Sequence, residues 1–158
     1  MSDTAPLQLH REIVRPDWVD YNGHLRDAFY LLIFSYATDA LMDYIGLDEA
    51  GRTRTHGSIY TLECHINYLH EVKVGAEVRV ETQLIGHDAK RLHIYHAMHL
   101  AGAAEPVSVS EQMLLHVDTR GPKSAAFDPD VMARVQAIAA AHGRLPQPKY
   151  AGRVIRLP

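Results

Sequence analysis

The sequence has one cysteine, Cys64, among its 158 residues, so no disulfide can form within the chain. No apolar run approaches the ~18 residues needed to cross a bilayer. The N-terminus, Met-Ser-Asp-Thr-Ala-Pro, has no apolar signal core. These absences predict a protein of the cytoplasm, where thiols stay reduced and where no membrane is a partner.

Basic charge is also scarce. The formal net charge is −3 at pH 7, and no long basic run is present. Nucleic-acid binding is therefore not expected, because it depends on Lys and Arg side chains that neutralise phosphates. The sequence also lacks a Gly-x-Ser-x-Gly nucleophile elbow, a His-Glu-x-x-His metal motif and a glycine-rich phosphate loop.

The chain does contain one long apolar segment, residues 26–45, which predicts a helix that is apolar on nearly all sides and is capped by Gly46. Polar residues 47–57 predict a loop. Period-two alternation and the flanking turn signals predict strands at residues 7–14, 58–69, 72–84, 91–100 and 107–117, and a second helix at 128–141 with Asp128 as N-cap. From residue 145 an extended arm is expected.

This order of elements predicts one α+β domain, residues 1–158, in which a curved antiparallel sheet of about five strands wraps round one long helix. A chain of this length can bury ~70% of its unfolded surface. The outline is that of the hotdog fold.

The short polar segment before the long helix holds the residues best placed for chemistry. Asp20 lies in an Asp-Tyr-Asn-Gly-His turn beside the helix N-terminus, where free N–H groups can polarise a carbonyl while the acid attacks it or directs a water. Asn22 is a candidate to orient that water, and His24 to orient substrate or tune Asp20. Each has a structural alternative: a turn aspartate, a left-handed turn residue and a structural histidine. Asp27 is expected to face the helix dipole.

Three histidines at spacing three, His93, His96 and His99, suggest a metal site. The segment reads as a strand, which places His93 and His99 on one face ~20 Å apart and His96 on the other. They cannot bind one zinc ion. The sequence therefore predicts no metal. The Asp20 turn suggests acyl-group hydrolysis, for which water and a positioned carboxylate suffice, so no organic cofactor is expected either.

Asp20-Tyr-Asn-Gly-His-Leu-Arg-Asp-Ala-Phe-Tyr30 resembles the Asp-x-x-Gly-His-x-Asn-Asn-x-x-Tyr signature of hotdog acyl-CoA thioesterases of the 4-hydroxybenzoyl-CoA thioesterase type. Residues 68–75 are similar to their Tyr-x-x-Pro-x-x-x-Gly element. The resemblance implies that Asp20 is the catalytic carboxylate. The sequence departs from the pattern at Arg26 and Asp27, which stand for Asn-Asn, and at Glu71, which stands for proline.

Segments that begin at Glu63, Lys90, Glu111 and Pro148 resemble the betainyl-CoA thioesterases of carnitine breakdown. This resemblance implies hydrolysis of betainyl-CoA to glycine betaine and CoA. A trimethylammonium group needs aromatic faces and negative charge. The candidates to bind it are Trp18, Tyr21 and Tyr30, with Glu63 for the charge; the other tyrosines near them in the expected fold are Tyr36, Tyr60 and Tyr68. For the aromatics, ordinary core packing is the alternative.

For several further polar residues the sequence allows more than one role. Lys90 and Arg91, at a predicted hairpin, are candidates to hold the CoA phosphates or are simply solvated. Glu63, His65 and Asn67 form a stripe that either faces solvent or lines a pocket at a subunit interface. Glu111 is paired, at a bulge or in a functional cavity.

The predicted partner is an acyl-CoA substrate, in a homodimer or homotetramer. Three other functions remain: a general acyl-CoA thioesterase, a non-catalytic acyl-CoA-binding hotdog subunit, and a hotdog hydratase. The hydratase resemblance is an acid and a histidine one residue further apart than Asp20 and His24. The sequence leaves open the acyl range and whether Asp20 attacks directly or activates water.

Overall fold

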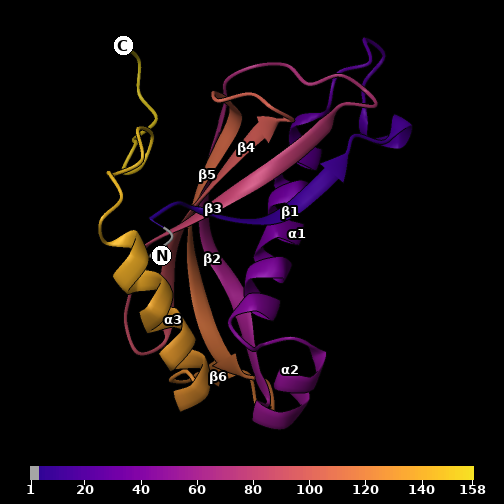
Figure 1. The fold of residues 1–158 in the computed structure, drawn as a ribbon. Helices are drawn as coiled ribbons and strands as arrows, with labels where there is room; N and C mark the ends of the chain where they lie inside the picture. Colours follow the sequence, from indigo (N-terminus) through magenta and orange to yellow (C-terminus); the bar gives the residue numbers. More distant parts are fainter. Residues whose placement is uncertain (1–3) are drawn as a thin grey trace.

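An antiparallel sheet curves round a long helix in the computed structural model, which describes residues 4–158 (Figure 1). The five long strands lie in the order β1-β3-β4-β5-β2, and the short β6 pairs with β5. In chain order the elements are β1 (Leu7–Ile13), η1 (Pro16–Trp18), α1 (Asp27–Tyr44), α2 (Glu49–Thr55), β2 (Gly57–Tyr68), β3 (Glu77–His87), β4 (Arg91–Leu100), β5 (Pro106–Asp118), β6 (Lys123–Ser124) and α3 (Pro129–His142). The predicted hotdog architecture is confirmed.

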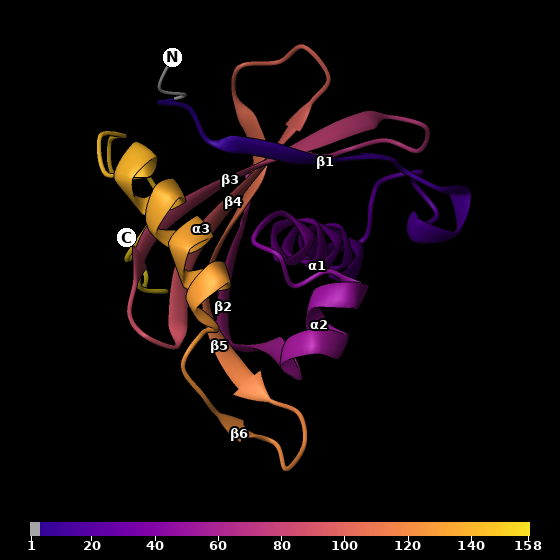
Figure 2. The ribbon, with the colours of Figure 1, turned by 60° about the horizontal axis from the view of Figure 1, so that its bottom comes forward.

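Helix α1 lies in the concavity of the sheet, and Figure 2 looks nearly along its axis. Its buried face, which includes Ile33 and Phe34, packs against Val78, Val80 and Met98 of the sheet. Leu31 on the opposite side of the helix is 43% exposed. In the single chain α1 is therefore covered on its sheet side only, whereas the sequence predicted a helix surrounded on all sides. None of the helices within residues 4–158 is long and apolar enough to cross a membrane.

Helix α3 closes the other end of the core. Its Val131, Val135 and Ile138 form a second apolar cluster with the end of α1 and with β3, β4 and β5. Asp128 caps the helix as predicted, because its side chain accepts the N–H of Asp130. The chain after α3 then reaches the convex face, where the N–H of Gly152 donates to Glu111 at 2.8 Å.

One histidine is enclosed in the core between α1 and the sheet. His96 is fully buried, with Nε2 2.9 Å from Thr38 Oγ1 and Nδ1 2.9 Å from Thr82 Oγ1. Its ring stacks on Phe34 at 5.8 Å. Burial, reinforced by the charge of His10, lowers the pKa of His96 to about 3. The ring is therefore neutral in the folded protein, and both of its nitrogens have partners.

The predicted loop at residues 47–57 is wrong in part, since Glu49–Thr55 form helix α2. Asp48 is its N-cap and accepts the N–H of Gly51 at 2.8 Å. Gly51 is needed for close packing rather than for a loop: a Cβ there would lie 1.9 Å from the carbonyl oxygen of Gly46. The glycine that suggested a loop in fact allows α2 to fold back on the end of α1.

The predicted strand at residues 72–84 also needs correction, because β3 begins at Glu77. Residues before it form a turn, with Gly75 at a φ of 80° and Val74 44% exposed. Val72 is buried because it packs in the apolar cluster around α1, and its carbonyl accepts the N–H of Leu25 at 2.7 Å. The turn region is thereby fixed beside the segment that precedes α1.

Candidate functional site

Asp20 lies in the tight turn between η1 and α1, as predicted. Its Oδ1 accepts the N–H of Asn22 at 2.8 Å and of His24 at 3.1 Å. Its own N–H donates to the carbonyl of His24, and the N–H of Gly23 donates to the carbonyl of Asp20. Gly23 has a φ of 76°, a conformation that favours glycine. Asp20 therefore bonds its own turn through Oδ1 and still has a free oxygen, because Oδ2 accepts no hydrogen bond within residues 4–158.

The carboxylate of Asp20 is held in its charged form. The N–H of His24 contributes most to lowering the pKa of Asp20, and the N–H of Asn22 adds to it. Hydrogen bonds to the charged form favour ionisation. Asp20 therefore presents an oriented, ionised oxygen at physiological pH.

His24 connects this turn to the segment that follows β2. It forms an isolated bridge with Lys73, and its Nε2 lies 3.3 Å from Oε2 of Glu71. Glu71 had no role in the sequence-based prediction. The signal that could have identified it was the replacement of proline in the motif, but the sequence alone did not indicate its partner.

The start of α1 offers fewer free N–H groups than predicted. The side chain of Asp27 accepts the N–H of Ala28 at 2.9 Å, and the N–H of Phe29 donates to the carbonyl of Arg26 at 3.0 Å. Asp27 thus lies in the first helical turn, as expected from the dipole. The N–H of Asp27 donates to no acceptor in the described part of the chain.

The predicted aromatic residues do not form one open cage. Trp18 is 3% exposed; its ring stacks on Phe29 at 5.9 Å, and Arg15 lies 4.7 Å from its centroid. Tyr30 is also buried, and its hydroxyl donates to the carbonyl of His70 at 3.2 Å. Tyr21, in contrast, is 93% exposed. For Trp18 and Tyr30 the core-packing alternative describes the single chain.

Tyr68, at the end of β2, is the aromatic side chain that links the sheet to the start of α1. Its ring meets Tyr30 edge-on at 5.1 Å, and its hydroxyl donates to the carbonyl of Asp27 at 3.1 Å. The residue is 51% exposed. Tyr68 therefore presents a fixed ring surface beside the start of α1, the helix that follows the Asp20 turn.

Glu63 borders a different hollow, of about 270 Å³, on the convex face of the sheet. The other charged or titratable residues that line it are His65, His93, Glu111 and Arg153. Glu111 is paired and also lines the hollow. Its Oε2 lies 2.7 Å from His93 Nε2, and its Oε1 accepts the N–H of Gly152. His93 and His96 lie on opposite faces of β4, as predicted, and His99 lies 3.4 Å from Glu81.

Lys90 and Arg91 lie at the far end of the sheet from Asp20. The ten residues of β4 run between the two ends, a length of about 30 Å. The Lys90 ammonium donates to Ser124 at 3.3 Å, and Arg91 pairs with Asp88 at 2.6 Å. One chain thus does not bring these cations to Asp20.

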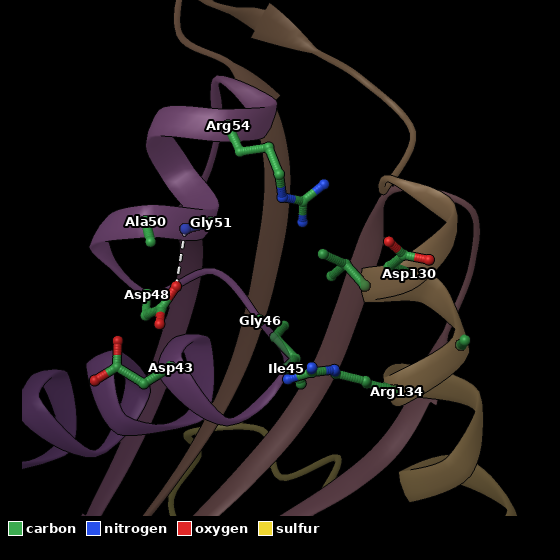
Figure 3. A pocket seen from close by; sticks show the side chains of 11 residues that line it. Asp43, Ile45, Gly46, Asp48, Ala50, Gly51, Arg54, Asp130 and Arg134 are labelled. Atoms are coloured by element: carbon green, nitrogen blue, oxygen red, sulfur yellow. Dashed lines mark hydrogen bonds between the residues drawn. The ribbon is translucent and has the colours of Figure 1, made fainter.

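A larger hollow, of about 540 Å³, opens between the end of α1, α2 and α3 (Figure 3). Asp43, Asp48 and Asp130 line it together with Arg54 and Arg134, so its charges nearly cancel. It lies at the C-terminal end of α1, whereas Asp20 precedes the N-terminal end. This hollow is therefore separate from the Asp20 site.

Curated proteins with similar sequences are betainyl-CoA thioesterases, alone or joined to an L-carnitine dehydrogenase. A family model, the thioesterase-like superfamily, matches residues 14–135. A betainyl-CoA thioesterase of Pseudomonas aeruginosa is 63% identical over 152 residues, 96% of each chain. An L-carnitine dehydrogenase/betainyl-CoA thioesterase of Agrobacterium fabrum is 46% identical over 96% of this chain and 31% of its own length.

Solved structures agree on the fold. A Pseudomonas putida KT2440 protein assigned as a thioesterase is 53% identical and superposes with a TM-score of 0.84 over 97% of each chain. A Staphylococcus aureus protein solved in complex with CoA superposes with a TM-score of 0.88 over 98% of each chain. Its identity is 24%, so it supports the fold alone.

Proposed function

Because the chain belongs to the thioesterase-like superfamily, we propose that it hydrolyses betainyl-CoA to glycine betaine and CoA, with Asp20 as the catalytic carboxylate. The observation that carries the assignment is the Asp20 turn, which holds an ionised carboxylate with one free oxygen. The 63% identity to a betainyl-CoA thioesterase supports the choice of substrate.

Two routes use the same carboxylate. In the first, Asp20 attacks the thioester carbon, the C–S bond breaks, and the electron pair leaves with the CoA thiolate; water then hydrolyses the mixed anhydride. In the second, Asp20 orients a water that attacks the same carbon; the C–S bond breaks, its electron pair leaves with the CoA sulfur, and the proton released by the water passes to that thiolate or to solvent. The lowered pKa of Asp20 makes it a weak base, which favours attack or orientation over full proton removal. Rapid quench and mass spectrometry distinguish the two, because only direct attack adds the acyl mass to the protein.

The Asp20→Asn variant tests the assignment. The amide oxygen can still accept the N–H groups of Asn22 and His24, so the turn should persist while the charge is lost. Loss of one catalytic group of this kind costs on the order of a hundredfold in turnover. We expect that loss in a thiol-release assay on betainyl-CoA, with an unchanged circular dichroism spectrum. Near-normal turnover would remove Asp20 from the mechanism, and saturable binding by a wild-type protein without turnover would favour a non-catalytic subunit.

We also propose a homodimer formed through β2. Among residues 4–158 this twelve-residue strand pairs only with β5, and it exposes Tyr60, Leu62 and Tyr68. A long edge strand with exposed apolar side chains is a template for pairing with another chain. A register shift between Thr61 and Glu63 interrupts its alternation, so Tyr60 and Cys64 lie on opposite faces. Leu62→Lys should weaken the dimer in light scattering.

Such a dimer would give Lys90 and Arg91 access to substrate. Antiparallel pairing of β2 about a two-fold axis sets the start of one β2 beside the end of the other. The end of β2 lies near Asp20 through Tyr68, and its start lies at the Lys90 end of the sheet through β5. We therefore propose that Lys90 and Arg91 of one copy bind the phosphates of the CoA whose thioester lies at Asp20 of the other.

The remaining proposals concern setting. We place the protein in the cytoplasm, a reducing compartment, because its single cysteine is an unpaired thiol. We propose hydrolysis without metal or organic cofactor, since Asp20 and water supply both reacting groups. Full activity after dialysis against a chelator is the expected result, and loss of activity would indicate that the enzyme needs a metal ion.

A further inference from the structure

We infer that Glu71 and the exposed ring of Tyr68 form the subsite for the quaternary ammonium of the acyl group. The inference rests on the proposed function, and it replaces Glu63 as the source of the compensating charge. It assigns to Glu71 a role in substrate specificity.

The position of Glu71 beside the Asp20 turn is fixed by backbone bonds. The N–H of Leu25 donates to Val72 at 2.7 Å, and the N–H of Val74 donates to Gly23 at 3.0 Å. Glu71 therefore directly precedes a segment that runs alongside the end of the turn. Its Oε2 lies 3.3 Å from His24 Nε2, and the N–H of the same histidine donates to Asp20.

The Glu71 carboxylate is free to meet a ligand. Its side chain is 76% exposed, and Oε1 has no partner among residues 4–158. One oxygen thus lies beside the His24 ring, and the other is free to meet a cation.

A betainyl group carries its positive charge close to the carbon that reacts. Its nitrogen is bonded to the methylene that carries the carbonyl, so the nitrogen and the carbonyl carbon are only about 2.5 Å apart. A counter-charge near Asp20 can therefore attract the cation while the carbonyl reacts. Glu71 and Asp20 both contact His24, whereas Glu63 borders the hollow on the convex face.

Aromatic surface lies beside the same carboxylate. Tyr30 donates to the carbonyl of His70, the residue before Glu71, and Tyr68 packs edge-on against Tyr30. Burial raises the pKa of Tyr30, and the charge of Glu71 adds to this effect. A trimethylammonium group binds well to aromatic faces but cannot donate a hydrogen bond. The half-exposed Tyr68 ring and Glu71 together match that requirement.

The test compares betainyl-CoA with 3,3-dimethylbutyryl-CoA, which has the same shape without the charge. Glu71→Gln keeps an acceptor for His24 and removes the charge. For an exposed ion pair we expect kcat/KM on betainyl-CoA to fall about two- to fivefold, with little change on the neutral thioester. Glu71→Lys should lower kcat/KM on betainyl-CoA further, because it places a positive charge beside the cation. Glu105→Gln is the matched control, because this exposed residue lies in the turn between β4 and β5, and it should leave both rates unchanged.

The outcomes separate two failures. Equal loss on both thioesters in Glu71→Gln, or no loss on either, would overturn the subsite while hydrolysis by the wild type stands; equal loss would leave Glu71 as a residue that only positions His24. Wild-type protein that hydrolyses neither thioester would overturn the proposed function itself, and the subsite with it. Thermal unfolding of each variant checks that the fold is intact.

Discussion

The buried histidine predicts how the stability of this protein depends on pH. The unfolded chain binds a proton at His96 with a pKa of about 6.5. In the folded protein burial lowers the pKa of His96 to about 3. The folded state therefore binds fewer protons than the unfolded state in this window. The contribution of His96 to the free energy of unfolding is fully present above pH 6.5, and it is lost as the pH falls toward 3.

The size of the effect follows from the gap between the two values. Each pH unit inside the window costs about 1.4 kcal/mol of unfolding free energy per group. Between pH 7.5 and 4.5 the chain crosses about two such units, so His96 alone should remove about 2.7 kcal/mol. That is a large fraction of the ~5–15 kcal/mol that typically holds a domain folded.

The perturbation that isolates His96 is His96→Gln. An amide can donate to Thr38 and accept from Thr82, the two partners at 2.9 Å, but it does not titrate. Urea unfolding at fixed protein concentration, at pH 7.5, 6.5, 5.5 and 4.5, should show a shallower loss of stability in the variant than in the wild type. The difference between the two slopes removes the contribution of other acidic and histidine groups. Parallel slopes for both proteins would refute a depressed pKa at His96.

Three further predictions concern the site and its frame. Gly23→Ala forces a side chain into a φ of 76° with nothing within 4 Å to clash, so backbone strain alone should cost about 1–2 kcal/mol; thermal unfolding checks this, Gly23→Asn should be milder, and equal effects would contradict it. Tyr30→Phe loses the hydrogen bond to His70 and should cost about 0.5–1.5 kcal/mol in urea unfolding, whereas no loss would show that bond to be immaterial. Neutralising Lys90 and Arg91 together should raise KM for the CoA ester more than it lowers kcat, and the wild-type KM should rise with salt; an unchanged KM with a lower melting temperature would indicate a solvated turn.

The fold and the turn around Asp20 could be predicted because their determinants are local in the sequence. Period-two alternation defines β4 and β5, Asp128 caps α3 through its own next turn, and Asp20 bonds the N–H groups of residues two and four positions on. Each of these features depends on a few adjacent residues, so the sequence carries it in full. The error at α2 arose because Gly51 packs closely against Gly46 at the end of α1, and the error at the start of β3 arose because Val72 contacts the distant Leu25 instead of a strand partner.

What only the tertiary structure decided is which distant residues meet. His24 meets Glu71, forty-seven positions away in the numbering, because the segment after β2 runs back along the Asp20 turn. Trp18 is covered by Phe29 and Arg15, while Glu63 faces the convex side of a strand whose bulge changes its alternation. Sequence spacing fixes neighbours along a strand or a helix turn, but contacts between segments follow from how the whole core packs. The sequence by itself therefore determined the architecture and the turn that holds Asp20, and the packing of the chain decided which residues surround that carboxylate.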